Sequence, residues 1–169
     1  MKRPSKLWQR NVIGAVVTVA SLAAVVATDL GPKWSHYLGT VHPGADAPRG
    51  EDVTVDSQSW KLGEVRHLGR RVKPPGSTLP AGTVVTVVTV LRDGAPGPEL
   101  GCDGVLTDGR HRWRGQPPIH YGLKPVAGAA LNCARPGPIQ WAFTIPDGVV
   151  PTALDVTTYD GSILVRLQL

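Results

Sequence analysis

Two histidines, His111 and His120, are the side chains of this sequence with the widest chemical range. Together with Asp103 or Asp108 they supply imidazole and carboxylate groups, which are ligands that zinc accepts in proteins. Such a site requires that two loops converge. Because nothing in the spacing demands this convergence, we expect no metal to be bound here.

Two cysteines, Cys102 and Cys133, offer a second chemistry. A thiolate beside His111 or His120 would form a nucleophile–base pair. On the exported side of a membrane, however, oxidising conditions make a disulfide the default state of two cysteines. We therefore predict a disulfide between Cys102 and Cys133, and no cysteine nucleophile. Closing this loop should stabilise the fold by roughly 3 to 4 kcal/mol.

Motifs of common enzymes do not occur in the sequence. GxSxG, HExxH, CxxC, GxxxxGK and a GxGxxG followed by an acid are all absent. His36 and His42 are six residues apart, which neither helix nor strand spacing brings together, so we expect them to be solvated. Four Asp-Gly pairs lack the alternating oxygen ligands of a calcium loop and predict turns: Asp93-Gly94, Asp108-Gly109, Asp147-Gly148 and Asp160-Gly161. The sequence therefore predicts no catalytic residue and no cofactor.

The location of the chain is indicated by Asn11–Thr28, a run without a charged side chain. It follows a basic head, residues 1–10, and this charge step holds an N-terminus in the cytoplasm. Since about 20 apolar residues span a bilayer, we predict a transmembrane anchor at residues 11–30. The alternative is a signal peptide cleaved near Ala27, after which the protein is secreted. In both cases residues 51–169 lie outside the cytoplasm.

The net charge of +5 comes mainly from the head, which holds four of the 18 Lys and Arg and none of the 13 acids. A nucleic-acid-binding domain keeps a concentrated basic face of its own, so we expect no nucleic-acid partner. One basic cluster remains outside the head, with Arg66, His67, Arg70, Arg71 and Lys73. It is interpreted either as a contact surface for an anionic polymer, anionic lipid or acidic partner, or as a strand edge whose charges prevent aggregation.

The elements that must position these residues are predicted to be strands. Glycine and proline together are frequent, with 20 and 16 residues, and favour a chain that turns often. Residues 31–50 contain three prolines and four glycines without an apolar period, and predict a stalk. Thr83–Leu91 is almost wholly β-branched and predicts a central strand with both faces covered.

Alternation and turn dipeptides predict shorter strands around this one. They are expected at Val53–Val55, at Trp60–Leu68 with a bulge near Gly63 and Trp60 buried, at Cys102–Trp113 as a hairpin, and at Ile139–Ile145, Leu154–Val156 and Ile163–Leu169. Between them, residues 92–98 predict a loop, and residues 116–133 an irregular segment with an exposed Tyr121 and one helical turn at Ala127–Leu131. The pattern predicts an all-β, antiparallel sandwich of about seven to nine strands at residues 51–169, with a small barrel as the alternative.

One part of the chain resembles a known group of domains. Val105-Leu106-Thr107-Asp108-Gly109 with Trp113, the loop to Gly137, Trp141-Ala142-Phe143-Thr144-Ile145-Pro146 and Ala153-Leu154-Asp155-Val156 resemble bacterial extracytoplasmic immunoglobulin-like β-sandwich domains of unknown function. In these, a strand ending in an Asp-Gly turn precedes a strand ending in an aromatic-x-hydrophobic-Pro corner. The chain lacks the lipid-acceptor cysteine of the lipoprotein members and adds the Cys102 and Cys133 pair. The resemblance implies binding or scaffolding, and no catalytic residue.

We therefore expect a membrane-anchored extracytoplasmic binding module of the cell envelope, without catalysis, whose partner is a protein or an envelope component. Its expected contact residues are Arg66, Arg70, Arg71 and Tyr121. Two alternatives remain open. The protein would be an accessory subunit of a membrane assembly acting through its transmembrane helix, or an envelope hydrolase or metal-dependent enzyme built on His111, His120 and nearby acids.

Overall fold

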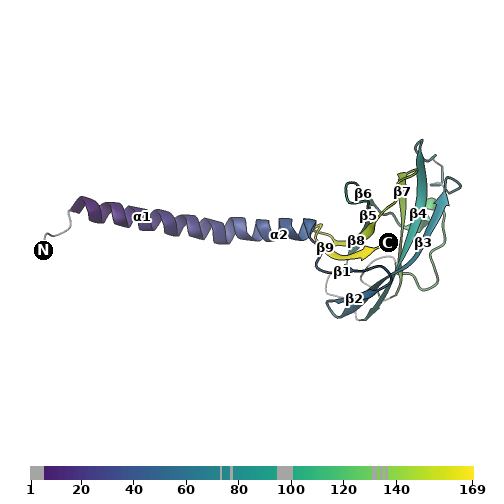
Figure 1. Ribbon diagram of the computed structural model, residues 1–169, viewed down its shortest axis with the longest axis horizontal. Coiled ribbons are helices and arrows are strands. Elements are labelled where there is room, and N and C mark those ends of the chain that lie inside the picture. The colour runs from purple at the N-terminus through teal and green to yellow at the C-terminus, as the bar shows by residue number, and fades with distance from the viewer. Residues whose placement is uncertain are drawn as a thin grey trace. The chain divides into compact units, whose positions relative to one another are not determined.

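The computed structural model describes residues 6–72, 74–76, 78–94, 101–130, 133, 135 and 137–169 (Figure 1). The chain forms two compact units, Met1–Leu38 and Gly39–Leu169, which are described separately. The first unit is helical and the second contains all nine strands found in the described residues.

A helix runs from Lys6 to Val41 as α1 (Lys6–Val25), a π turn η1 (Val26–Leu30) and α2 (Gly31–Val41). From Trp8 onward it is long and apolar enough to cross a membrane, with a mean hydropathy of 2.0 in its most apolar 18-residue window. Residues 31–41 of the expected stalk are helical. Pro32 has no N–H for the carbonyl four residues earlier, and the π turn just before it is a place where helices absorb such a mismatch.

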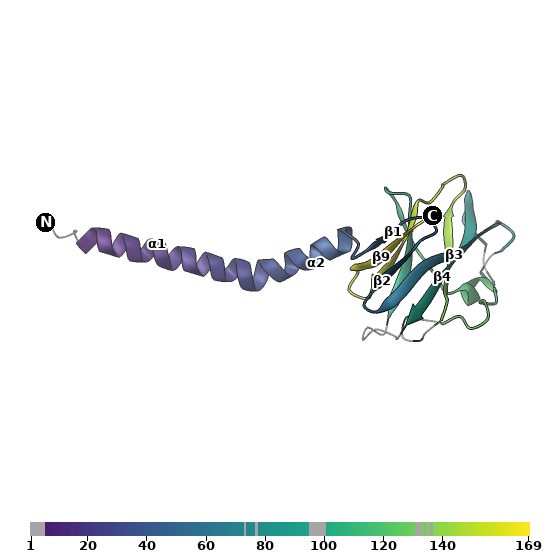
Figure 2. The ribbon, with the colours of Figure 1, turned by 60° about the horizontal axis from the view of Figure 1, so that its bottom comes forward.

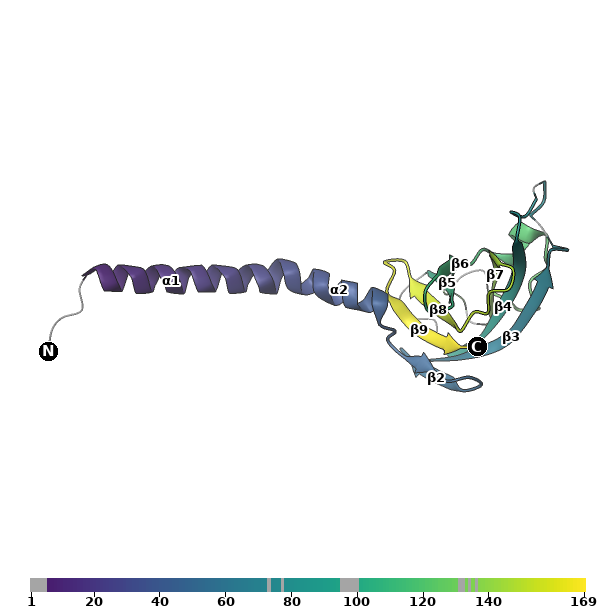
Figure 3. The ribbon, with the colours of Figure 1, turned by 45° about the horizontal axis from the view of Figure 1, so that its top comes forward.

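The second unit is a sandwich of two sheets. The strands are β1 (Asp46–Ala47), β2 (Asp52–Val55), β3 (Gln58–Gly69), β4 (Thr83–Gly94), β5 (Cys102–Thr107), β6 (Arg112–Arg114), β7 (Ile139–Pro146), β8 (Ala153–Thr158) and β9 (Ile163–Gln168). One sheet has the order β1-β9-β8-β5-β6 and the other β2-β3-β4-β7 (Figure 3). All pairings are antiparallel except that of β1 with β9. The predicted β-sandwich is confirmed, and its compact unit begins at Gly39, ahead of the expected boundary at residue 51.

Strand β4 lies between β3 and β7 and is covered on both faces, as its composition predicted. On its inner face, Val88 and Val90 belong to the core between the sheets, together with Trp60 and Phe143. On its outer face, a second apolar cluster contains Val85, Val87, Tyr121 and Ala142. This second cluster exists because residues 116–130 pack over the outside of the four-stranded sheet, where the green segment lies in Figure 2.

Tyr121 is therefore not an exposed contact residue, as the sequence suggested, but a buried one. It ends the short 3-10 helix η2 (Pro118–Tyr121), and its hydroxyl lies 2.8 Å from Thr144 Oγ1. The helical turn expected at Ala127–Leu131 is replaced by a plain turn at Ala127–Gly128, with Leu131 outside the described residues. The sequence pattern failed because the segment has no period of its own; its side chains are placed by the sheet beneath them.

The remaining strand predictions are largely confirmed. β3 carries a bulge between Leu62 and Val65, and Trp60 is buried. Asp108-Gly109 lies in the turn between β5 and β6, and Leu106 faces Trp113 across that hairpin. β4 continues to Gly94, so the loop expected from Arg92 begins later, and residues 95–98 lie outside the described residues.

The predicted disulfide between Cys102 and Cys133 is present, with the two Cα atoms 5.5 Å apart. Arg92 is buried beside it, donates a hydrogen bond of 2.6 Å from Nη1 to the carbonyl of Cys133, and lies 5.6 Å from the centre of the Trp60 ring. Burial lowers the pKa of Arg92 from its ordinary value. The disulfide and this arginine together attach the start of β5, in the five-stranded sheet, to the inner face of the four-stranded sheet.

Candidate binding groove

A groove of about 610 Å³ opens between the two sheets of the sandwich. Its floor is apolar because Leu62 and Val65 of β3 belong to the rim of the core. The wall opposite is made by Val149, Val150 and Pro151, which connect β7 to β8. The full lining is Arg49, Gly50, Leu62, Gly63, Val65, His67, Val149, Val150, Pro151 and Leu169.

The groove exists because β3 extends beyond the end of its pairing with β2. β2 pairs with β3 only from Gln58 to Lys61, whereas β4 follows β3 as far as Gly69. On its β2 side, β3 therefore has no ladder partner from Leu62 onward in the described residues. Gly63 makes the bulge possible, since a Cβ there would lie 2.9 Å from the carbonyl oxygen of Thr89.

The rim of the groove is basic. Arg49 enters from the loop between β1 and β2, and His67 is exposed on β3, with Nδ1 3.1 Å from Thr86 Oγ1. Val150, in the wall, has 79% of its surface exposed. An apolar floor with the guanidinium group of Arg49 at its edge suits a molecule with an apolar body and an anionic group.

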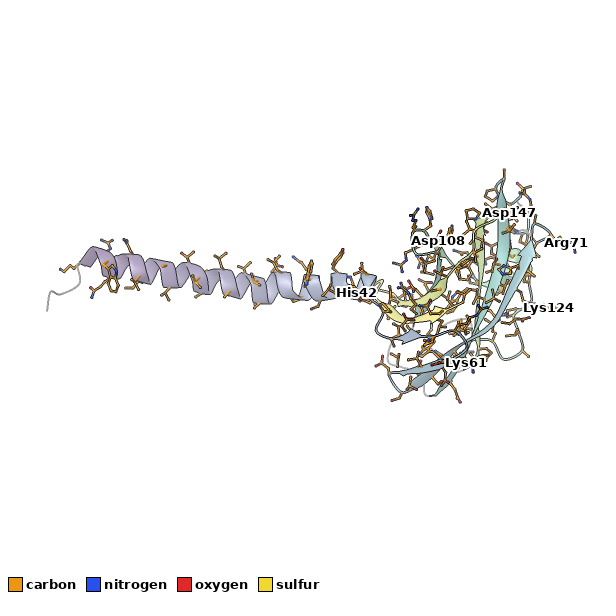
Figure 4. The ribbon with its side chains drawn as sticks, viewed as in Figure 1. His42, Lys61, Arg71, Asp108, Lys124 and Asp147 are labelled. Carbon is orange, nitrogen blue, oxygen red and sulfur yellow. A yellow bond between two sulfur atoms is a disulfide. The ribbon has the colours of Figure 1, made fainter. Side chains whose placement is uncertain are left out.

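The basic cluster of β3 does not gather at this groove as a whole. Arg66 faces Val87 across the ladder, so it lies on the outer side of the sheet, where Glu64 is 3.5 Å away. Arg70 and Arg71 are exposed in the turn that follows β3 (Figure 4). Lys73 lies outside the described residues. Because alternate residues of a strand point to opposite faces, Arg66 and His67 diverge, and His67 is the one described member of this cluster that lines the groove.

The candidate metal-ligating residues are also separated. His111 is in the turn between β5 and β6, whereas His120 is in η2, which packs against the other sheet. Asp103 is paired with Arg114. Among the described residues, no three His, Cys, Asp or Glu side chains come close enough to hold a metal ion.

Asp108, a candidate metal ligand, forms hydrogen bonds within its own turn. Its Oδ1 accepts backbone N–H groups of His111, at 2.6 Å, and Arg110, at 2.8 Å, while Oδ2 lies 3.0 Å from His111 Nδ1. These contacts, first of all the backbone N–H of His111, hold the pKa of Asp108 well below its usual range. The carboxylate is therefore a turn-forming group, as the Asp-Gly pair predicted.

An ionic network that the sequence did not predict lies on the outer face of the five-stranded sheet. Asp155 of β8 is fully buried and accepts two hydrogen bonds from Arg166 of β9 and one from Arg112 of β6. The hydrogen bonds between Arg166 and Asp155, ahead of the opposing effect of burial, raise the pKa of Arg166 above its ordinary value. The available signal was the single acid between Leu154 and Val156, since an acid that alternates with core residues must be paired on the other face.

Comparison with known proteins gives two weak structural likenesses. A secreted protein from Mycobacterium tuberculosis, MPT63, has 15% identity and a TM-score of 0.49 over 76% of this chain and 98% of its own. An uncharacterized β-sandwich protein from Clostridium difficile 630 has 12% identity and a TM-score of 0.36 over 73% of this chain and 94% of its own. No protein-family model and no curated protein matches the sequence.

Proposed function

We propose that this protein is a membrane-anchored binding module of the cell envelope. Residues 11–30 hold the chain in the cytoplasmic membrane with the N-terminus inside, and the β-sandwich binds a protein or an envelope component on the outer side. The apolar helix and its basic flank support the anchor. The disulfide supports an oxidising compartment.

The groove is the observation that carries the binding role. It combines an apolar floor, an unpaired length of β3 and the basic side chains of Arg49 and His67 in a cavity of about 610 Å³. Concave, mostly apolar sites with a few polar groups are where proteins bind ligands. The groove therefore accepts a partner that offers an apolar side chain or tail next to an acidic group.

We also propose that the sandwich is immunoglobulin-like. The order β9-β8-β5-β6 corresponds to strands G-F-C-C′ of that fold, and β3-β4-β7 to strands A-B-E. The parallel pairing of the short β1 with β9 and the extra strand β2 are additions at the edges. This assignment supports a binding role by analogy of fold alone.

A photo-crosslinking amino acid placed at Val150, in full-length protein expressed in its own cells, tests the groove. The matched control is the same amino acid at Tyr159, which is equally exposed, at 77%, but is not part of the groove lining. We expect a crosslinked product from position 150 that is absent from position 159. Leu62→Asp, which puts a charge on the apolar floor, should abolish the product.

Equal products from both positions, or a product from position 150 that survives Leu62→Asp, would argue against the groove. Membrane anchoring is measured separately, by whether the protein stays with the membrane pellet after an alkaline carbonate wash. Release into the supernatant would favour the secreted alternative with cleavage near Ala27, which N-terminal sequencing would identify.

A further inference from the structure

A second cavity lies on the outer face of the five-stranded sheet, away from the groove. It has a volume of about 380 Å³, and its lining includes Arg110, Arg112 and Arg166. We call this cavity the arginine pocket. Thr40 and Val41, at the end of α2, line the same cavity. All of these residues belong to the compact unit Gly39–Leu169.

The arginine pocket keeps an excess of positive charge. Asp155 is its single acidic lining residue, and it accepts hydrogen bonds from both Arg166 and Arg112. Asp46 lies close enough to Arg166 to act on its charge, but the Asp46 carboxylate accepts hydrogen bonds from Gln168. The lining thus contains three guanidinium groups and one buried carboxylate, and Asp46 is the strand partner of Arg166.

The arginines differ in how far they are engaged. Arg166 uses Nε and Nη2 on Asp155, at 2.6 and 2.9 Å, so it is held in place. Arg112 reaches Asp155 by one contact of 3.3 Å, and 45% of its side chain is exposed. Arg110 is exposed in the turn after β5, and its backbone N–H donates a hydrogen bond to the carboxylate of Asp108. Arg112 and Arg110 therefore have guanidinium donors for an anion, and such donors match phosphate oxygens in geometry.

The end of α2 forms part of the rim, and its position in the chain indicates which anion the arginine pocket meets. Trp34 and Tyr37 are exposed aromatic residues of α2, of the kind found at the headgroup level of membranes. Thr40 follows Tyr37 by three positions within α2, a distance of about 4.5 Å along the helix. If the helix spans the bilayer with Tyr37 at the headgroups, Thr40 at the rim of the arginine pocket lies within the about 10 Å over which headgroup charge acts.

We infer that the arginine pocket binds the phosphate of an anionic phospholipid headgroup and so docks the sandwich on the bilayer surface. This inference rests on the membrane anchor of the proposed function. It assigns a ligand to a site distinct from the groove, and it leaves the groove free for its partner.

The test uses the full-length protein in nanodiscs of phosphatidylcholine alone or of phosphatidylcholine mixed with phosphatidylglycerol. Binding to the folded state raises its stability, so we expect the anionic discs to raise the Tm of the sandwich by about 3 °C. The variant Arg110→Gln/Arg112→Gln should lose this difference. Because each variant is compared with itself in two lipids, a change in its basal stability does not affect the readout.

The matched control is Arg70→Gln/Arg71→Gln, which removes the same charge elsewhere. Arg71 lies on the opposite side of the sandwich from His42, the residue that follows α2 (Figure 4). This control should keep the full Tm difference between the two discs.

Three results would overturn the inference. They are no Tm difference for the unmodified protein, an equal loss in both double variants, and an equal Tm rise when inorganic phosphate is added to phosphatidylcholine discs. Failure of the anchor is scored beforehand, as protein that leaves the discs in high salt. A protein that stays in the discs without a lipid-dependent Tm would keep the anchor and reject the arginine pocket as a lipid site.

Discussion

Arg166 holds Asp155 in a two-pronged contact, with Nε 2.6 Å from Oδ1 and Nη2 2.9 Å from Oδ2, although Asp155 is fully buried. The two residues face each other directly across β8 and β9. Burial of a carboxylate is tolerated because the guanidinium fork satisfies both of its oxygens. The same carboxylate therefore orients both Arg166 and Arg112, two of the arginines that line the arginine pocket.

Asp155→Ala should be strongly destabilising, since it leaves two arginine side chains without their carboxylate. We expect a loss of about 3 kcal/mol in the free energy of unfolding, measured by urea titration. Asp103→Ala is the matched control, because Asp103 also pairs with an arginine of β6 but its side chain is 28% exposed. That control should cost less than about 1 kcal/mol. Equal losses in the two variants would show that burial does not set the strength of the pair.

Removal of the disulfide should destabilise the sandwich without changing its fold. Cys102 and Cys133 are 31 residues apart, and closing a loop of this length gives about 3.5 kcal/mol in the chain-entropy model. The double variant Cys102→Ser/Cys133→Ser should therefore unfold at lower urea concentration than the oxidised protein. The reduced unmodified protein is the control and should match the variant. An unchanged midpoint would mean that the unfolded state is not restrained by this bond.

Asp108→Asn should make the protein less stable at neutral pH and remove part of its acid sensitivity. The folded pKa of Asp108 lies below the unfolded value of about 3.9, so its contribution is complete above about pH 4 and declines as pH falls toward the folded value. The difference between variant and unmodified protein should accordingly shrink below about pH 4. Urea midpoints at neutral and acidic pH measure this. A constant difference across that range would show that the charge of Asp108 is not involved.

Gly104→Ala should be destabilising because β5 passes directly over Trp141. A Cβ at Gly104 would lie 2.5 Å from Cδ2 of the Trp141 ring, inside van der Waals contact. We expect a loss of about 1 to 3 kcal/mol, measured by thermal or urea unfolding. Trp141→Leu makes room for that methyl group, so the double variant should be less destabilised than the sum of the two single variants. Strict additivity would contradict a direct clash.

The strands were predictable because their information is local. Thr83–Leu91 is rich in β-branched residues, which favour strands, and Ile139–Ile145 alternates apolar and other side chains, which is the order expected of a strand with one buried face. The Asp-Gly turns are local for the same reason, since Asp108 bonds to N–H groups two and three residues away. The disulfide was predictable because only two cysteines are available.

The candidate sites were predictable only in part. Arg66, Arg70 and Arg71 are neighbours in the sequence, yet the strand directs Arg66 and His67 to opposite faces. Tyr121 was expected at the surface because its segment has no period, and it is buried because a sheet lies beneath it. The groove brings together Arg49, Leu62 and Val150, which are far apart in the chain.

The sequence alone determined the apolar N-terminal run, the strand content, the turns and the pairing of the two cysteines. Each of these depends on residue order or on residues near one another in the chain. Only the tertiary structure decided that the end of α2 shares a pocket with Arg112 and Arg166, and that β3 extends past β2 to leave a groove. The physical reason is that both cavities are formed by long-range strand pairing, which depends on the packing of the whole core and is not written in any single segment.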